Sequence, residues 1–194
     1  LRPGGNDRIY ICKSMVHSST ITGEILVALS TGAQLIALNP KVLPAAHRRR
    51  IQQYRPTFLC LPPALLYFFN RIASYESFQS LHTVHVSGSI PSRSALRQFH
   101  VKFPWIRLLN GYGLSEMSPR VSYSDSSDGV KPGSGGKAIE GVEIEVRNEF
   151  GNLCPTGEIG EIYVRSAAQM SGYLTTGKLP WAPEALSWIA TGDL

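Results

Sequence analysis

The stretch WIRLLNGYGLSE, residues 105–116, joins a short apolar run to two glycines and a carboxylate. The apolar run, residues 106–109, predicts a buried strand that breaks at Asn110-Gly111. Gly111 and Gly113 predict positive φ angles and a close approach of the backbone to a ligand. Backbone N–H groups in such a turn can form an anion-binding nest.

The side chains of the same stretch indicate a nucleotide site. Tyr112, between the glycines, offers a flat face for stacking. Ser115 offers a hydroxyl group, and Glu116 offers an oxygen ligand of the kind that Mg²⁺ prefers. This order of groups is typical of a nucleotide site at the carboxyl end of a strand. A glycine-rich turn with a surface glutamate has the same local pattern, so the stretch alone leaves both interpretations open.

Upstream of this stretch, apolar runs alternate with helical patterns. We expect strands at residues 9–12, 34–38, 57–61, 84–86 and 106–109, and helices at residues 20–29, 44–54, 64–73 and 91–103. The first helix is expected to bury Ile21, Ile25, Leu26 and Leu29, which recur at helical spacing. Repeated βα units of this length predict an α/β fold with a mainly parallel sheet flanked by helices.

Beyond Pro119 the pattern changes. Residues 122–136 are rich in Ser, Asp and Gly and predict a loop or lid. Residues 142–146 and 158–164 predict antiparallel strands joined by a turn at residues 148–152. We therefore predict an α/β subdomain over residues 1–134 and a small antiparallel β subdomain over residues 135–194.

Composition excludes several classes of protein. The chain has 194 residues and a net charge of +5, and its basic residues are dispersed. The run Arg48-Arg49-Arg50 lies in a predicted helix without interleaved aromatics, so it predicts a solvated helix face rather than a nucleic-acid site. No apolar run reaches the length of a membrane span.

Cysteine and histidine spacing gives no sign of a zinc site or a disulfide framework. The three cysteines, Cys12, Cys60 and Cys154, are far apart, and the five histidines form no metal-binding motif. Cys12 and Cys60 lie in apolar runs and are predicted to be core residues. This usage favours a reducing intracellular compartment. Because the sequence starts at Leu1 and stops directly after a turn-like segment, we expect it to be a piece of a longer protein.

Four segments together resemble the adenylate-forming superfamily, which includes acyl- and aryl-CoA synthetases, firefly-type luciferases and the adenylation domains of peptide synthetases. They are VSGSI (86–90), NGYGLSE (110–116), GEIGEIYV (157–164) followed by GYL (172–174), and WIATGDL (188–194). The segment KPGSGGK, residues 131–137, is most similar to the coumarate-ligase and luciferase branch. The resemblance covers nearly the whole chain.

The resemblance implies a role for each site residue. The implied nucleotide site consists of Ser87, Gly88, Ser89, Asn110, Gly111, Tyr112, Gly113 and Asp193. Within it, Tyr112 would stack on adenine and Asp193 would hold the ribose hydroxyls. The turn Ser87-Gly88-Ser89 would line both the adenine and the acyl pockets.

The catalytic residues implied by the resemblance are Ser115, Glu116 and His17. Ser115, in place of the family's threonine, would contact phosphate. Glu116 would serve the Mg²⁺–phosphate group. His17 would lie beside the acyl pocket.

The implied reaction joins a carboxylic acid to ATP, giving an acyl-adenylate and pyrophosphate. The implied cofactors are ATP or AMP, Mg²⁺, and CoA or the phosphopantetheine of a carrier protein. No aspartate lies between Asp7 and Ser77, where amino-acid-activating relatives carry one, so an acid without an α-amino group is expected. The family's phosphate loop and lid lysine are missing from this sequence. The remainder of a parent chain would supply them, and this chain alone is expected to be inactive.

Three other functions stay open at this point. A non-catalytic module of the same fold could bind a nucleotide or a partner, and a peptide- or polyketide-synthetase adenylation domain has the same motifs. An unrelated Rossmann-like enzyme is disfavoured, because the first βα turn lacks GxGxxG. A cytoplasmic or peroxisomal location is expected for the enzyme.

Overall fold

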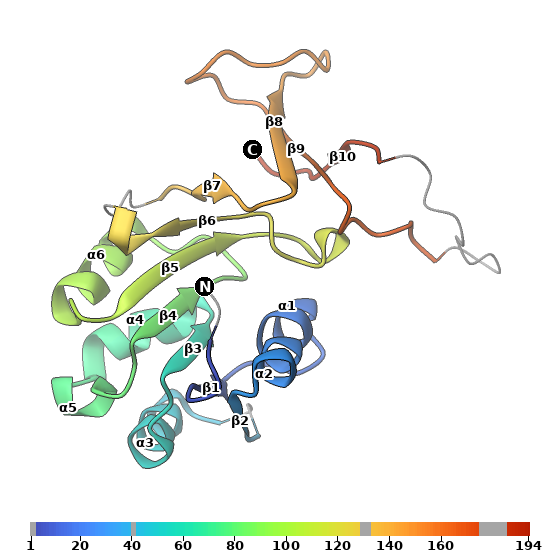
Figure 1. Cartoon of the computed structure of the whole chain (residues 1–194). Coiled ribbons are helices and arrows are strands. Elements are labelled where there is room, and N and C mark those ends of the chain that lie inside the picture. Colours follow the sequence, from blue (N-terminus) through green and yellow to red (C-terminus); the bar gives the residue numbers. More distant parts are fainter. Residues whose placement is uncertain (1–2, 40–41, 129–132, 175–185) are drawn as a thin grey trace.

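The computed structural model describes residues 3–39, 42–128, 133–174 and 186–194. A seven-stranded mixed sheet has the strand order β2-β1-β3-β4-β5-β6-β7, and a three-stranded sheet has the order β10-β9-β8. Helices cover both faces of the large sheet, and the small sheet lies beyond its β6–β7 edge (Figure 1).

Five strands form the parallel part of the large sheet, as predicted. They are β1 (Arg8–Ile11), β2 (Gln34–Ala37), β3 (Phe58–Leu61), β4 (Thr83–Val86) and β5 (Arg107–Tyr112). β1 pairs in parallel with both β2 and β3, and β3–β4 and β4–β5 are also parallel. Their carboxyl ends therefore meet at one edge of the sheet.

Residues on alternate sides of the strands build two apolar layers. Tyr10 and Leu59 face α3 (Pro44–Tyr54), α4 (Pro63–Ile72), α5 (Tyr75–Phe78) and α6 (Arg93–Lys102). Phe58 and Cys60 face α2 (Leu26–Thr31) on the other side. Burying each large apolar side chain contributes about 1.5–3 kcal/mol, so both layers fix the strands in place. Cys12 and Cys60 are buried, which confirms their prediction as core residues.

The prediction that the chain leaves the strand at Asn110-Gly111 was wrong. β5 continues through Tyr112, because β6 (Ser122–Asp125) pairs with it in antiparallel register, Asn110 opposite Ser124. The loop predicted over residues 122–136 was wrong for residues 122–125, which form β6. Residues 129–132 of this predicted loop lie outside the described ranges. A short 3₁₀ helix, η3 (Ser126–Asp128), follows β6.

The helix predicted over residues 20–29 forms, but with a different buried face. It consists of α1 (Ser18–Thr20), one turn of π-helix η1 (Ile21–Ile25), and α2. The wider π turn rotates the residues that follow it. Leu26 and Leu29 are therefore exposed, and Ile21 at the start of the π turn is exposed as well, whereas Thr20 and Glu24 are fully buried.

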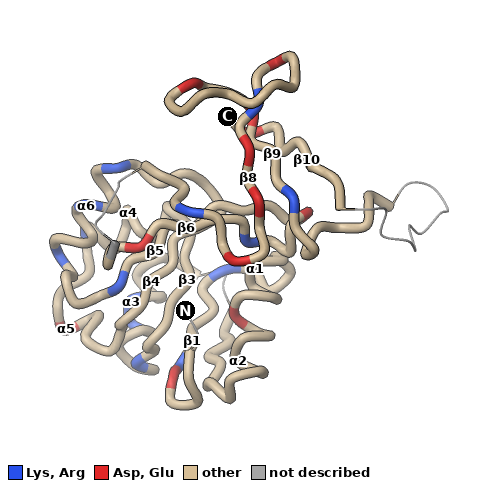
Figure 2. Tube along the Cα trace, turned by 45° about the horizontal axis from the view of Figure 1, so that its top comes forward, with Lys and Arg blue, Asp and Glu red and all other residues tan. Residues whose placement is uncertain are grey.

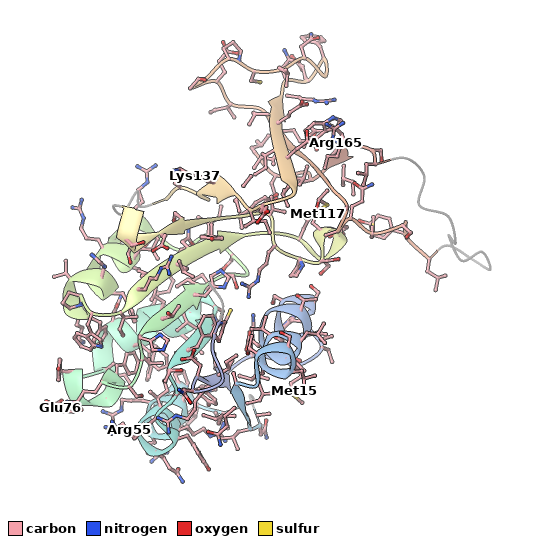
Figure 3. The ribbon with its side chains drawn as sticks, in the orientation of Figure 1. Met15, Arg55, Glu76, Met117, Lys137 and Arg165 are labelled. Atoms are coloured by element: carbon pink, nitrogen blue, oxygen red, sulfur yellow. The ribbon has the colours of Figure 1, made fainter. Side chains whose placement is uncertain are left out.

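The small sheet is antiparallel, as predicted, and contains β8 (Val142–Arg147), β9 (Glu161–Ser166) and β10 (Ile189–Ala190). β7 (Lys137–Ala138) pairs with β6 in the large sheet. Met117 packs with Val121 and Val164, and Figure 3 places Met117 where the two sheets meet. A division of the chain between residues 134 and 135 stays a prediction.

Lys and Arg residues are spread along the described chain rather than gathered in one patch (Figure 2). None of the helices in the described ranges is both long and apolar enough to cross a membrane.

Candidate functional site

A cleft of about 270 Å³ opens at the carboxyl ends of β4 and β5, beside α1. Its described lining residues come from three segments of the chain, the start of α1 (residues 17–19), the end of β4 with the turn that follows it (residues 85–88), and residues 109–123. Seven of the predicted site residues line it, namely His17, Ser87, Gly88, Gly111, Tyr112, Gly113 and Ser115. Ser89, Asn110, Glu116 and Asp193 lie outside this lining.

Tyr112 and Asp193 are brought together although they are 81 residues apart in the chain. The hydroxyl of Tyr112 donates a hydrogen bond to Oδ2 of Asp193 over 2.7 Å. Burial and the neighbouring Asp193 carboxylate raise the pKa of Tyr112 to about 12, so the hydroxyl stays a donor at neutral pH. The backbone of Asp193 is tied to the small sheet, because its carbonyl accepts from Ile162.

Gly111 and Gly113 are required for a different reason than the one predicted. Neither has a positive φ angle; Gly111 lies within β5, and Gly113 directly follows it. A Cβ on residue 111 would lie 2.2 Å from Nε2 of His85, and a Cβ on residue 113 would lie 1.8 Å from the carbonyl oxygen of Pro119. The glycines therefore admit neighbouring protein atoms, and the positive φ angles predicted for them are not found.

Ser115 and Glu116 lie in the 3₁₀ helix η2 (Ser115–Met117), which follows the two glycines. Oγ of Ser115 is 3.0 Å from Oγ of Ser18, so η2 and α1 meet at the mouth of the cleft. The hydroxyl of Tyr173 donates to Oε1 of Glu116 over 2.7 Å. This hydrogen bond lowers the pKa of the Glu116 carboxyl, which is therefore ionised at neutral pH.

Within the described ranges, the turn after β4 is hydrogen-bonded at its first residue. The backbone N–H of Ser87 donates to Leu61, whereas Gly88 and Ser89 are exposed. Gly88 has a φ of 98°, which is the conformation that favours glycine. Asn110 lies on β5 and donates from Nδ2 to the carbonyl of Ser134 over 2.9 Å, so it anchors the segment that precedes β7.

Two histidines line the cleft in different states of burial. His17 is exposed and stands at the start of α1, where its carbonyl accepts from Thr20 and Ile21. His85 is buried in β4. Burial, aided by the positive charges of Arg120 and Lys13, lowers the pKa of His85 to about 3. His85 is therefore a neutral imidazole at physiological pH.

A buried polar cluster lies beneath the cleft. Nζ of Lys13 is 3.0 Å from Oε1 of Glu24 and donates to Oγ of Ser19 and to Sγ of Cys60. Burial lowers the pKa of Lys13, but its contacts with Cys60 and Glu24 outweigh that effect and raise it overall. Burial raises the pKa of Glu24 to about 8 against the opposing influence of Lys13.

Sequence reasoning missed several residues of the cleft and its surroundings. His85 had a usable signal, because an imidazole in a central apolar strand is unusual. Arg120 and Lys13 had none, since a single charged residue after a strand or a proline is most often solvated. Tyr173 lies in the quoted GYL segment, but only the fold shows that its hydroxyl reaches Glu116.

The metal-ligand chemistry of the site rests on one carboxylate. No cluster of three His, Cys, Asp or Glu side chains suited to a metal ion occurs in the described parts of the chain. Glu116 is ionised and accessible at the mouth of the cleft. Mg²⁺ in nucleotide sites commonly takes one or two protein carboxylates, with phosphates and water as its other ligands. The donor set therefore fits a magnesium ion held together with a nucleotide.

Comparison with known proteins gives consistent matches. The family model described as AMP-binding enzyme matches residues 1–174. A 4-coumarate–CoA ligase-like protein of Arabidopsis thaliana is 27% identical over 198 residues, which cover 98% of this chain and 35% of that protein. A long-chain-fatty-acid–CoA ligase of Yersinia pestis is 27% identical over 202 residues, which cover 100% of this chain and 34% of that protein.

Solved structures show the same fold. An anthranilate CoA ligase, determined in complex with anthranoyl-AMP, superposes with a TM-score of 0.83 at 19% identity, covering 97% of this chain and 37% of that chain. At this identity the likeness concerns the fold. The chain spans about a third of the length of the relatives that it matches.

Proposed function

Because the chain belongs to the AMP-binding enzyme family, we propose that its cleft binds an adenine nucleotide beside a carboxylic acid, as part of an acid-activating ligase. The contact between Tyr112 and Asp193 carries this proposal. It brings an aromatic ring and a carboxylate to one end of the cleft, and these are the groups that a base and a ribose need.

Each nucleotide contact follows from the chemistry of the group. The ring of Tyr112 stacks on the base, while its hydroxyl fixes the Asp193 carboxylate. The carboxylate accepts hydrogen bonds from the two ribose hydroxyls, which are charge-assisted contacts. Ser87, Gly88, Ser89, Asn110, Gly111 and Gly113 supply the backbone around the base. The exposed turn at Gly88 leaves space for a ligand, since no atom of the described residues beyond its chain neighbours lies within 4 Å of a Cβ placed there.

The proposed reaction activates the acid in one displacement. An oxygen of the substrate carboxylate bonds to the α-phosphorus of ATP, and the bond from that phosphorus to the bridging oxygen breaks. Pyrophosphate leaves with the electron pair. Ser115 contacts phosphate through its hydroxyl, and Glu116 would hold Mg²⁺, which neutralises phosphate charge when bound. His17 flanks the acid, and neutral His85 forms part of the floor of the cleft.

The product of this step is an acyl-adenylate. A thiol would then attack its acyl carbon, lose its proton and form a thioester as the bond to the phosphate oxygen breaks and AMP leaves. The thiol belongs to CoA or to the phosphopantetheine of a carrier protein. We place the chain within a longer ligase, because it spans only 35% and 34% of the two curated relatives. The absence of an aspartate between Asp7 and Ser77 favours acids without an α-amino group. An intracellular location, cytoplasmic or peroxisomal, belongs to the same proposal.

The test is acid-dependent exchange between ATP and pyrophosphate in the full-length protein that contains this chain. We expect exchange with a carboxylic acid that has no α-amino group. Glu116→Gln should lower the exchange rate sharply while AMP binding without metal persists, because it removes a magnesium ligand but no part of the base pocket. AMP binding without exchange for any acid would favour a non-catalytic module instead, and absence of both would refute the proposal.

A further inference from the structure

The cleft contains a fixed positive charge that the proposed nucleotide contacts do not use. Among the described residues that line the cleft, Arg120 is the one with a permanent charge, and no lining residue is acidic. No ion pair joins Arg120 to a carboxylate within the described ranges. A guanidinium that is partly withdrawn from water without a counter-ion is costly, so an anionic ligand group would stabilise it.

Gly23 of η1 holds the guanidinium in place. Nη2 of Arg120 lies 3.4 Å from the carbonyl oxygen of Gly23, and a Cβ on residue 23 would lie 2.1 Å from the same nitrogen. Any other residue at position 23 would displace the guanidinium. Glycine within a helix is less favourable than alanine, and the space that it leaves for Arg120 is the structural reason for glycine here.

Other groups around Arg120 do not neutralise it. Nε of Arg120 is buried and has no hydrogen-bond partner among the described residues. Glu24, the carboxyl group of the buried polar cluster, contacts Lys13 rather than Arg120. His85, which borders the same cleft, stays neutral, partly because of the positive charge of Arg120. The local field in this part of the cleft is therefore positive.

Arg120 stands on the acid side of the proposed site. Its contact is with η1, on the helical side of the cleft next to α1. The Tyr112–Asp193 pair lies toward the small sheet, and in Figure 1 α1 and β10 lie on opposite sides of the end of β5 and β6. The guanidinium thus lies on the η1 side of the cleft, whose lining also includes His17.

We infer that the acid activated in this cleft carries a second carboxylate, which pairs with Arg120. The inference rests on the proposed function and narrows its substrate class to dicarboxylic acids, aliphatic or aromatic. The reacting carboxylate loses its charge when its oxygen bonds to phosphorus, whereas the second keeps its charge throughout. Arginine binds carboxylates in a bidentate manner. The same charge repels an α-ammonium group.

The experiment compares dicarboxylic acids with their monomethyl esters, which keep the reacting carboxylate and the size but lose the second charge. The pairs are succinate with monomethyl succinate and phthalate with monomethyl phthalate, at constant ionic strength. Acid-dependent ATP–pyrophosphate exchange is measured in the full-length protein. At least one dicarboxylate should exceed its ester in kcat/KM by about tenfold or more, as expected for a charge-assisted pair.

Variants of Arg120 test whether its guanidinium causes the preference for dicarboxylates over their monomethyl esters. Arg120→Met should remove the preference by raising the KM of the dicarboxylate, while the KM of ATP stays unchanged. Arg120→Lys should keep part of the preference for the dicarboxylate, because it keeps the positive charge. Arg97→Met, an exposed arginine on α6, is the matched control and should keep the wild-type ratio.

Each contrary result has a distinct meaning. Equal or lower activity with both dicarboxylates would overturn the inference, even if Arg120→Met did not fold. A higher KM for ATP in Arg120→Met, with the acid preference intact, would assign Arg120 to nucleotide phosphate and also overturn it. Exchange with monocarboxylic acids alone would overturn the inference and leave the proposed function standing. Failure of exchange with every acid, together with loss of AMP binding, would refute both.

Discussion

The glycines of the cleft act through the side chains that they lack. Gly113 leaves room for the carbonyl oxygen of Pro119, and Gly111 leaves room for the imidazole of His85. These contacts bring residues 119–120 and β4 close to β5. The position of Arg120 therefore depends on Gly113 as well as on Gly23.

Gly113→Ala should destabilise the chain by about 1–3 kcal/mol, the usual cost of overpacking. The reason is that the added Cβ would lie 1.8 Å from backbone oxygen that cannot rotate away. Denaturant unfolding measures the free energy. Gly4→Ala is the control, because nothing lies within 4 Å of a Cβ there, and it should change stability by less than about 0.5 kcal/mol. Equal stability of the two variants would contradict this interpretation.

Glu24 gives the stability of the chain a specific pH dependence. Burial raises the pKa of its carboxyl from 4.5 to about 8, so the folded chain binds a proton that the unfolded chain releases in this range. The stabilisation is complete below about pH 4.5 and is lost as the pH rises toward 8. The total change is on the order of a few kcal/mol.

Glu24→Gln should remove this loss of stability at rising pH. Between pH 5 and pH 8, the free energy of unfolding of the wild type should fall relative to that of Glu24→Gln, as measured by denaturant unfolding at each pH. Glu76→Gln is the control, because Glu76 is an exposed carboxyl, and it should follow the wild type. Parallel pH profiles for the wild type and Glu24→Gln would show that Glu24 is ionised in the folded chain over the whole range.

At the scale of single elements, the sequence predicted the start of α6 slightly too early. The predicted helix began at Pro91, but the helix begins at Arg93 and Ser92 is its N-cap. Oγ of Ser92 accepts a hydrogen bond from the N–H of Ala95 over 3.2 Å. This bond satisfies one of the free donors of the first turn.

Ser92→Ala should therefore lower the free energy of unfolding by about 1 kcal/mol, within the range of N-cap losses. Ser92→Asp keeps an acceptor at the same position and should retain most of the stability. Thermal and denaturant unfolding of both variants test the cap. If alanine and aspartate behave alike, the hydroxyl contact does not contribute.

Local pattern predicted some elements well and others poorly, for physical reasons. The parallel strands follow from short apolar runs between helical patterns, which neighbouring helices do not alter. The buried face of the first helix could not be predicted, because a π turn shifts the helical spacing and the contact with Lys13 holds the polar Glu24 inside. β6 is polar even at its buried positions, Ser122 and Asp125, so only its pairing with β5 shows that it is a strand.

The residues of the candidate site also differ in how well the local sequence predicts them. The motifs selected Tyr112 and Asp193 separately, and the fold brings them into contact. Arg120 and Tyr173 act through neighbours that are distant in sequence, 97 residues for Arg120 and Gly23 and 57 for Tyr173 and Glu116. No spacing rule relates such pairs, so they become visible only in three dimensions.

At the scale of the whole molecule, the nucleotide contacts depend on the junction of two sheets. Tyr112 belongs to the large sheet, and Asp193 follows the last strand of the small one. Met117, Val121 and Val164 pack at this junction, and the N–H of Met170 donates to the carbonyl of Glu116 over 2.7 Å. The small sheet thus holds the carboxylate of Asp193 at the edge of the cleft.

The most direct measurement is a calorimetric titration of this chain with AMP, comparing the wild type with Tyr112→Ala, Tyr112→Phe and Asp193→Ala. Tyr112→Ala should weaken binding by about 1–3 kcal/mol, because it removes the stacking face. Tyr112→Phe keeps the ring and should lose only about 0.5–1.5 kcal/mol. Asp193→Ala should lose about 1.5–3 kcal/mol or more through its contacts with ribose. If Tyr112→Ala and Asp193→Ala, shown to be folded by circular dichroism, both bind AMP like the wild type, the cleft is not the nucleotide site.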